Sequence, residues 1–439
     1  MPRPACALST GKAALPAEET FFCITFKQMP ALMRLLCILL PLLCLHVFSS
    51  ANVLHTGHGQ PYPDLTVAAK AAVPGDTILL HNGTHAGDQS LQGLQGKPDR
   101  WIYLLAEKNG DVLFKGGTSA WRGSDIAYLH IEGMVFTGQT GNGLNLDDGG
   151  TYASPSHHIV FRHCIFRDMA ATGNNDLLKL SGANDLTIEE CTFLNGSPGG
   201  SGIDMVGCHN SLIRRCRFEN MGANAVQMKG GSSNIFVEAC VFKNAGSRAI
   251  NLGGSTGTAF FRPANAAWEA EGLKVHSNVF IGSEVPVAFV GCTRSEVVNN
   301  TIYKPGRWVI RILQENKDTA RFGKCGNNTF RNNIICFDEQ VRTACSTGPG
   351  TAAESFTFSN NLWFHTGDSA WPGPQLPAHE KSTLTGKDPL FRDTAKEDFS
   401  IKAGSPAAGA GFAVQHPEKD HAGTRFKSNR AIGAFEVKQ

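Results

Sequence analysis

The chain has 439 residues, of which 41% are hydrophobic and 18% are charged, and its formal net charge is +2. A chain of this length and composition can bury a large core, and a charge so close to zero excludes the strongly basic field of most nucleic-acid-binding proteins. Any attraction for an anionic partner must therefore be local. The 48 glycines predict many tight turns, as in a β-rich exported protein.

The first 51 residues contain the pattern of an export signal. Residues 33–51 (MRLLCILLPLLCLHVFSSA) hold one arginine, an apolar run from Leu35 to Phe48, and small residues that end at Ala51. This order predicts a secretory signal peptide at 33–51, and hence a secreted, periplasmic or extracellular protein without stable membrane insertion. A short membrane anchor is the alternative, although the apolar run is short for a span. Residues 1–32 fit neither pattern, and we interpret them as a non-native or disordered extension.

A short helix and a strand are expected next. Asp64 is a suitable helix N-cap, so residues 65–73 are predicted to form an amphipathic helix, and Thr77 to Leu80 a strand. A helix at this place would cover the open end of a stack of strands, which otherwise exposes apolar core and free strand edges.

From about Gly117 the chain repeats itself roughly every 25 residues, with two short strands in each repeat. One apolar position recurs throughout, as Phe136, Phe166, Phe193, Phe218, Phe242, Phe280, Ile302, Ile335 and Trp363. A unit this small cannot bury its own apolar face, so the copies must stack. We therefore predict an all-β, single-stranded right-handed parallel β-helix, with one domain at 52–437.

Two residues before that position, a cysteine column changes into an asparagine column. The column reads Met134, Cys164, Cys191, Cys216, Cys240, Asn278, Asn300, Asn333 and Asn361. We expect the cysteines to be small buried groups and the asparagines to bond to one another in an internal turn. One disulfide is expected, between Cys325 and either Cys336 or Cys345. No C-x-x-C pair occurs, so a cysteine metal site is not indicated.

The second strand of each repeat alternates and so places polar side chains on an outer face. Its outward column reads Asn145, Lys179, Asp204, Gln227, Asn251, Ala288 and Arg311. These side chains should lie about 4.8 Å apart from repeat to repeat, with Asp176, Lys229 and Arg248 beside them. A long insertion follows Leu252 and contains Phe261, Arg262 and Trp268. We expect this insertion to wall a groove over the polar column.

Over roughly residues 52–437 the chain resembles the right-handed parallel β-helix proteins of the pectin-lyase-like superfamily. Its nearest functional resemblance is to chondroitinase B and alginate lyases, in which a lysine is the base and an arginine in the next repeat is the acid, often with calcium. The resemblance implies Lys229 as base and, by a poorer match, Arg248 as acid. Asp176 and Asp204 are expected to be Ca²⁺ ligands, because carboxylate oxygens suit that ion. The remaining polar residues of the face and the insertion are expected to bind substrate: Lys179, Gln227, Asn251, Arg262 and Arg311. The family arginine should lie one repeat after Lys229 in its own column, where this chain has Gly253.

The predicted function is therefore a polysaccharide lyase, a monomer that cleaves an acidic, uronate-containing polysaccharide by β-elimination. The reaction removes the proton next to a uronate carboxylate, so that carboxylate must be neutralised and a base must reach the proton. A lysine can be that base when nearby positive charge and partial burial lower its pKa.

Two other functions remain open. One is a glycoside hydrolase or epimerase on the same scaffold; hydrolysis needs two carboxylates facing one bond, and the polygalacturonase and mannuronan-epimerase motifs are missing. The other is a non-catalytic, carbohydrate-binding β-helix. Its support is that Gly253 stands where the family has the arginine that acts as acid. The polar groups gathered on one face argue against a purely structural stack.

Overall fold

The computed structural model describes residues 51–437, which belong to one compact unit. The expected extension at 1–32 and, except for Ala51, the expected signal peptide at 33–51 lie outside the described residues and stay predictions. Among the residues described, there is no helix with the length and apolar character needed to cross a membrane.

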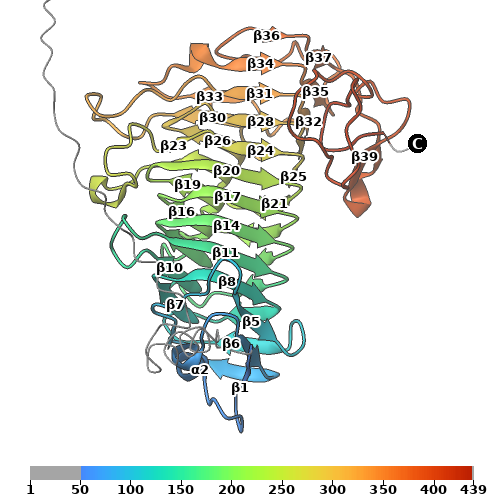
Figure 1. Cartoon of the computed structure of the whole chain (residues 1–439). Coiled ribbons are helices and arrows are strands. Elements are labelled where there is room, and N and C mark those ends of the chain that lie inside the picture. Colours follow the sequence, from blue (N-terminus) through green and yellow to red (C-terminus); the bar gives the residue numbers. More distant parts are fainter. Residues whose placement is uncertain (1–50, 438–439) are drawn as a thin grey trace, which may run out of the picture. The chain divides into compact units, whose positions relative to one another are not determined.

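The chain winds into a right-handed parallel β-helix made of three parallel sheets, which confirms the predicted fold class (Figure 1). Sheet A has 15 strands, sheet B has 12 and sheet C has 10, and successive strands of the chain pass from A to B to C. In Figure 1, sheet A faces the reader and the strands of sheet C lie to its left. A two-stranded antiparallel pair follows the solenoid.

The strands of the three sheets have the following bounds. Sheet A contains β1 Val53–Thr56, β2 Thr77–Leu80, β5 Ile102–Ala106, β8 Ala127–Glu132, β11 Ser156–Arg162, β14 Ala183–Glu189, β17 His209–Arg214, β20 Ser232–Glu238, β23 Ala270–Glu271, β24 Lys274–His276, β27 Cys292–Thr293, β28 Glu296–Val298, β31 Thr329–Arg331, β34 Thr357–Ser359 and β36 Glu380–Lys381. Sheet B contains β3 Gly83–Ala86, β6 Val112–Lys115, β9 Met134–Thr137, β12 Ile165–Arg167, β15 Thr192–Leu194, β18 Arg217–Met221, β21 Val241–Ala245, β25 Val279–Ile281, β29 Thr301–Tyr303, β32 Ile334–Phe337, β35 Leu362–His365 and β37 Leu384–Thr385. Sheet C contains β4 Gln89–Ser90, β7 Trp121–Ser124, β10 Leu144–Asp147, β13 Leu178–Ser181, β16 Ser201–Val206, β19 Asn224–Lys229, β22 Arg248–Gly253, β26 Val285–Val290, β30 Ile310–Leu313 and β33 Cys345–Thr347.

The recurring apolar column is confirmed as a continuous stack inside the solenoid. Phe166 pairs with Phe193, and Phe193 with Phe218, as direct neighbours in sheet B. Their ring centroids lie 4.8 Å apart in both cases, and the rings are nearly parallel. Because side chains alternate across a strand, one inward apolar side chain per turn forms this column, and its pairing fixes the register between neighbouring turns.

The asparagine column is confirmed as a buried hydrogen-bond ladder. Nδ2 of Asn278 donates to Oδ1 of Asn300 at 3.0 Å, and Asn300 and Asn333 donate to the next asparagine at the same distance. The backbone N–H of Asn278 also donates to Oδ1 of Asn300, at 2.9 Å. Each amide therefore satisfies the polar groups that a sharp turn leaves unpaired inside the core.

The expected disulfide of Cys325 is wrong. The nine cysteines in the described part of the chain are all buried free thiols. The two expected partners lie on separate sheets, Cys336 on β32 of sheet B and Cys345 on β33 of sheet C, and neither is bonded to Cys325. Cys325 instead lies beside Asn328, whose Nδ2 is 4.0 Å from its sulfur.

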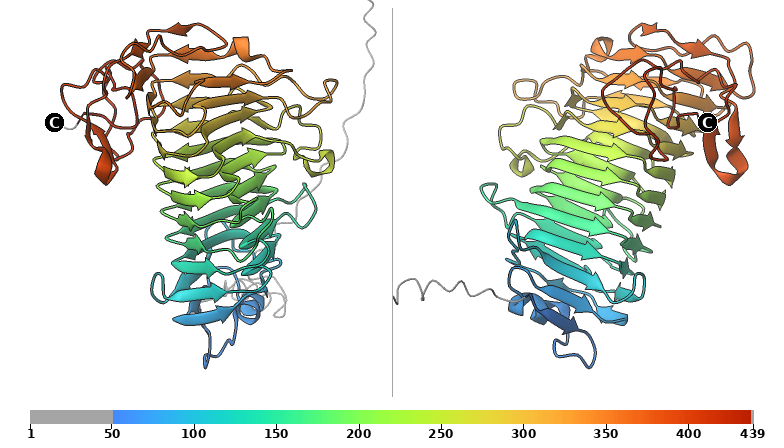
Figure 2. Two further views of the ribbon diagram at one scale, coloured as in Figure 1. Left: turned by 180° about the vertical axis from the view of Figure 1, so that it is seen from behind. Right: turned by 45° about the vertical axis from the view of Figure 1, so that its right-hand side comes forward.

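A helix covers the N-terminal end of the stack, and the C-terminal segment packs along one side of it. Helix α2 (Leu65–Ala71) begins after Asp64, whose carboxylate accepts from the N–H of Val67 at 2.9 Å; it ends two residues earlier than predicted because Ala72 is extended. After β37, the pair β38 (Phe391–Asp393) and β39 (Asp398–Ile401) and the C-terminal segment pack beside sheet B (Figures 1 and 2).

Candidate functional site

The predicted outward column lies on sheet C in the expected register. Asn145 pairs with Lys179, Lys179 with Asp204, and Asp204 with Gln227. Asn251, Ala288 and Arg311 continue the column on β22, β26 and β30. Strict alternation along these strands turns apolar side chains into the core and leaves this row on the outer face.

Five of the candidate residues form one group on this face, here called the lysine cluster: Asp176, Lys179, Asp204, Gln227 and Lys229. The ammonium of Lys179 contacts Oδ2 of Asp204 directly and lies 3.6 Å from Oδ2 of Asp176. The ammonium of Lys229 lies 3.5 Å from Oδ2 of Asp204 and donates to Oε1 of Gln227 at 3.2 Å. Two cations and two carboxylates therefore share one site.

Burial controls the charges in the lysine cluster. The side chains of Asp176 and Asp204 are only 6% and 4% exposed, whereas those of Lys179 and Lys229 are 23% and 19% exposed. Burial, and then the charge of Asp204, raise the pKa of Asp176 to about 6. Burial lowers the pKa of Lys179, but the charges of Asp204 and Asp176 outweigh it and raise that pKa overall. Lys179 is therefore held firmly as an ammonium.

The two lysines form the floor of a cavity of about 320 Å³. Ser181 and Val206 complete the floor, and the wall is made by residues 254–263, here called the groove loop. The buried carboxylates do not line this cavity. In Figure 2, the insertions after β22 and β30 project on the side opposite the C-terminal segment. The predicted groove wall is therefore present, over the predicted lysine.

The groove loop is tied down by several polar contacts. Glu269, which is buried, accepts from the N–H and the hydroxyl of Thr256 at 2.8 and 2.7 Å, and from the N–H of Gly230 at 2.9 Å. Nε2 of His209 lies 3.1 Å from the carbonyl oxygen of Arg262. These contacts hold the wall close to sheet C.

Arg262 fixes the groove loop to the solenoid through a buried ion pair. Its guanidinium bonds both carboxylate oxygens of Asp148, at 2.5 and 3.0 Å, across 114 residues of sequence. The Asp148 side chain is 1% exposed and that of Arg262 is 14% exposed. A Cβ at Gly207 would lie 2.5 Å from Cβ of Arg262, and the φ of Gly207 is +61°. Gly207, which follows β16, therefore leaves space for the side chain of Arg262. Arg262 lines the cavity while its guanidinium is paired with Asp148.

The other three candidates lie elsewhere on the same face. Arg248 begins β22 and pairs with Glu315 at 2.9 Å, and it lies 3.4 Å from Oδ1 of the buried Asn251. Arg311 stacks on Trp308 with 4.7 Å between its guanidinium and the ring. Burial, and then the charge of Arg248, lower the pKa of Arg311. None of the three lines the cavity over Lys229.

The backbone explains the glycine found where the resemblance expects an arginine. Gly253 has a φ of +101°, and a Cβ there would lie 1.9 Å from the carbonyl oxygen of Val290. Any larger residue would need the strand to move, since positive φ of this kind is open mainly to glycine. Arg248 is five residues earlier on the same strand, about 16 Å away along an extended chain.

Asp176 and Asp204 do not suit a calcium ion as they are arranged. Calcium takes six to eight oxygen ligands. Lys179 faces Oδ2 of both carboxylates, and the N–H of Ser201 donates to Oδ1 of Asp176 at 2.8 Å. Oδ1 of Asp204 is the oxygen left buried without a hydrogen bond. Among residues 51–437, no group of three or more His, Cys, Asp or Glu side chains is placed to hold a metal.

Several groove residues are absent from the predicted set. Arg122 on β7 pairs with Asn145 and lines a second cavity of about 520 Å³ on the same face, together with Asp147. The alternation Trp121-Arg122-Gly123 is the signal that would have extended the column. Phe260 lines the lysine cavity and is 63% exposed. Nothing local in the sequence indicates which way a loop residue of this kind faces.

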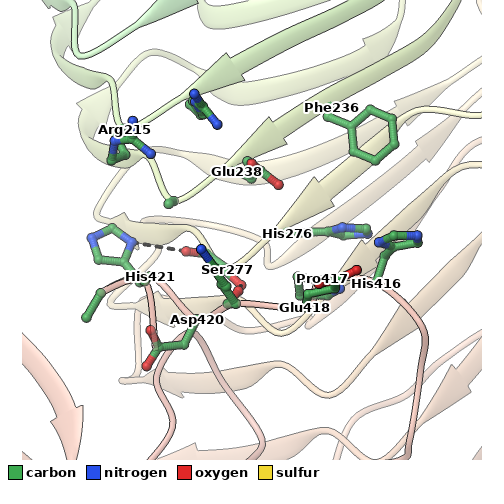
Figure 3. A pocket seen from close by; sticks show the side chains of 15 residues that line it. Arg215, Phe236, Glu238, His276, Ser277, His416, Pro417, Glu418, Asp420 and His421 are labelled. Carbon is green, nitrogen blue, oxygen red and sulfur yellow. Dashed lines mark hydrogen bonds between the residues drawn. The ribbon is translucent and has the colours of Figure 1, made fainter. Parts of the chain in front are cut away.

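Another cavity of about 520 Å³ lies between sheet A and residues 416–423 of the C-terminal segment (Figure 3). Nδ1 of His421 donates to the carbonyl oxygen of Ser277 at 3.0 Å, and the hydroxyl of Ser277 donates to the carbonyl oxygen of Lys419 at 3.0 Å. Burial lowers the pKa of His421. These contacts fasten the segment to the solenoid, so we assign this cavity to packing.

Comparison with known proteins agrees with the architecture. A family model described as a right-handed β-helix region matches residues 118–302. Among solved structures, pectate lyase Pel9A is 14% identical, with 89% of this chain and 97% of that chain covered and a TM-score of 0.59. XylC in complex with xylose is 10% identical, with 88% and 98% covered and a TM-score of 0.57.

An alginate lyase from Paenibacillus sp. strain FPU-7 is 17% identical, with 71% of this chain and 97% of that chain covered, but its TM-score is 0.43. No curated protein matches the sequence. At these identities, the likeness to Pel9A and XylC concerns the fold. The chain therefore has the right-handed parallel β-helix fold, and its residues 118–302 match the family model of that region.

Proposed function

We propose that the groove on sheet C binds an acidic polysaccharide and cleaves it by β-elimination, with Lys229 as the base. The observation that carries the proposal is the composition of the cavity floor. Lys179 and Lys229 line it, and the two aspartates that pair with them do not. A surface of this kind suits a polymer with one carboxylate on each sugar.

Lys229 suits the role of base better than Lys179. Lys229 has one carboxylate partner, Asp204 at 3.5 Å, and a neutral one, Gln227. Lys179 has two carboxylate partners. In the proposed reaction, Nζ of Lys229 first loses a proton to solvent and then takes the proton next to the uronate carboxylate, and the electron pair of that carbon–hydrogen bond forms a carbon–carbon double bond. The bond to the 4-linked oxygen breaks, and solvent water protonates that oxygen.

The position of Arg248 does not support it as the acid, since it is bound to Glu315 away from the cavity. Arg311 lies three turns from Lys229, about 14 Å along the axis at the usual strand spacing. We propose that Arg311 contacts a more distant sugar of the same polymer. The buried positions of Asp176 and Asp204 argue against a hydrolase, which needs both carboxylates at one bond.

A panel of acidic polysaccharides tests the proposal, with ultraviolet absorbance of the unsaturated uronate as the readout. The matched control for Lys229→Ala is Lys274→Ala, because Lys274 is an outward lysine on sheet A, over the ring of Phe236. We expect activity that Lys229→Ala lowers at least 100-fold and Lys274→Ala leaves intact. New reducing ends without the absorbance would mean hydrolysis, and binding without product would mean a non-catalytic protein. Either result would contradict the lyase.

A further inference from the structure

Lys179 is placed unlike an ordinary surface lysine. Its Cα is paired with that of Asp204 on the next strand, so backbone register alone brings the two side chains together. Its ammonium lies between Asp204 and Asp176, and both carboxylates are nearly fully buried. Two buried carboxylates this close need a cation between them, since neither can be solvated by water.

The position of Lys179 is one that a metal ion would otherwise favour. Asp176 and Asp204 each direct Oδ2 at the same point, and Oδ1 of Asp204 is buried without a hydrogen bond. Oε1 of Gln227 lies one strand further on in the same column. Hard oxygen donors grouped in this way suit a divalent cation such as calcium, but the ammonium fills the point where they converge.

We infer that Lys179 is a built-in cation that takes the place of calcium in this groove. This inference rests on the proposed function, and it assigns to Lys179 the task of neutralising the substrate carboxylate. Lys179 lines the same cavity as Lys229, so one uronate can meet both side chains. The chain therefore needs no metal at this site, and its elimination chemistry is insensitive to chelators.

Calcium binding tests the inference without any activity measurement. We expect calorimetric titration of wild-type protein with CaCl₂ to show no binding at the groove, and chelator to leave the melting temperature unchanged. Lys179→Ala removes the ammonium and leaves both carboxylates. It should bind one calcium ion at least tenfold more tightly than wild type, and Lys179→Ala/Asp204→Asn should lose that gain.

Two results would overturn the inference. One is calcium binding by the wild type that Asp204→Asn abolishes, because the site would then be open to metal. The other is a folded Lys179→Ala variant that gains no calcium affinity. If Lys179→Ala does not fold, Lys179→Gln replaces it in the same titration, with the same expected gain in calcium affinity and the same result that would overturn the inference. If the protein has no lyase activity on any polymer of the panel, the proposed function is refuted, but the calcium titrations keep their meaning.

Discussion

The ion pair between Arg262 and Asp148 should be the main support of the groove wall. Replacing Arg262 by alanine leaves the Asp148 carboxylate, which is 1% exposed, without its cation. Breaking a buried pair by removing one partner typically costs about 3–5 kcal/mol. One N–H, that of Gly150, still donates to Asp148 at 3.0 Å, so we expect the lower end, about 3 kcal/mol.

The assay is urea unfolding of the wild type, Arg262→Ala, Asp148→Ala and the double variant, combined in a double-mutant cycle. We expect a coupling energy of about 2 kcal/mol, because the double variant no longer contains a buried unpaired carboxylate. The control is Arg294→Ala, whose pair with Glu271 is 56% and 41% exposed and should be worth less than about 1 kcal/mol. Equal effects of Arg262→Ala and Arg294→Ala would refute the role of Arg262 as a strut.

Three further predictions concern the solenoid itself. Asn300→Ala removes acceptor and donor groups from the buried ladder and should lower the free energy of unfolding by about 3 kcal/mol. The control Asn82→Ala, at an exposed position, should change that free energy little, and equal changes would contradict the ladder. Phe218→Ala should cost about 3–5 kcal/mol in chemical unfolding, and a loss under 1 kcal/mol would show that the stack is loose. Burial lowers the pKa of His421 below its usual 6.5, so its contribution to stability is complete above about pH 6.5 and is lost as the pH falls below that value. The rate of protease cleavage in the C-terminal segment after residue 385 should therefore rise between pH 7 and pH 5 in the wild type and stay constant in His421→Gln. A rate that is constant in both proteins would refute the role of His421 in holding this segment.

The sequence predicts the fold well because one physical constraint recurs in every turn. A strand that pairs with copies of itself keeps each position in one column, so Phe193, Phe218 and Phe242 fix the register for the rest. The outer column of sheet C follows from the same alternation. The period of two along each strand therefore predicts Lys179, Asp204 and Lys229 on one face, where they lie within hydrogen-bond or ion-pair distance.

The remaining parts of the site depend on contacts that alternation does not specify. From the sequence, Arg262 is expected to bind substrate because it lies in the long insertion, but its partner Asp148 lies 114 residues earlier, and no local pattern links the two residues. Asp176 and Asp204 are expected to bind calcium because of their carboxylates, and the sequence does not show that Lys179 lies between them. Insertions differ in length from turn to turn, so neither their path nor the place of Phe260 follows from the repeat.

The measurement that tests the central claim most directly is binding of an acidic oligosaccharide to the groove. Calorimetry at low salt would compare the wild type, Lys179→Ala/Lys229→Ala and the sheet A control Lys274→Ala. We predict binding that weakens as salt rises, is lost in the double variant and is kept in the control. Equal affinity in all three proteins would contradict the claim that the two lysines on sheet C form the functional site.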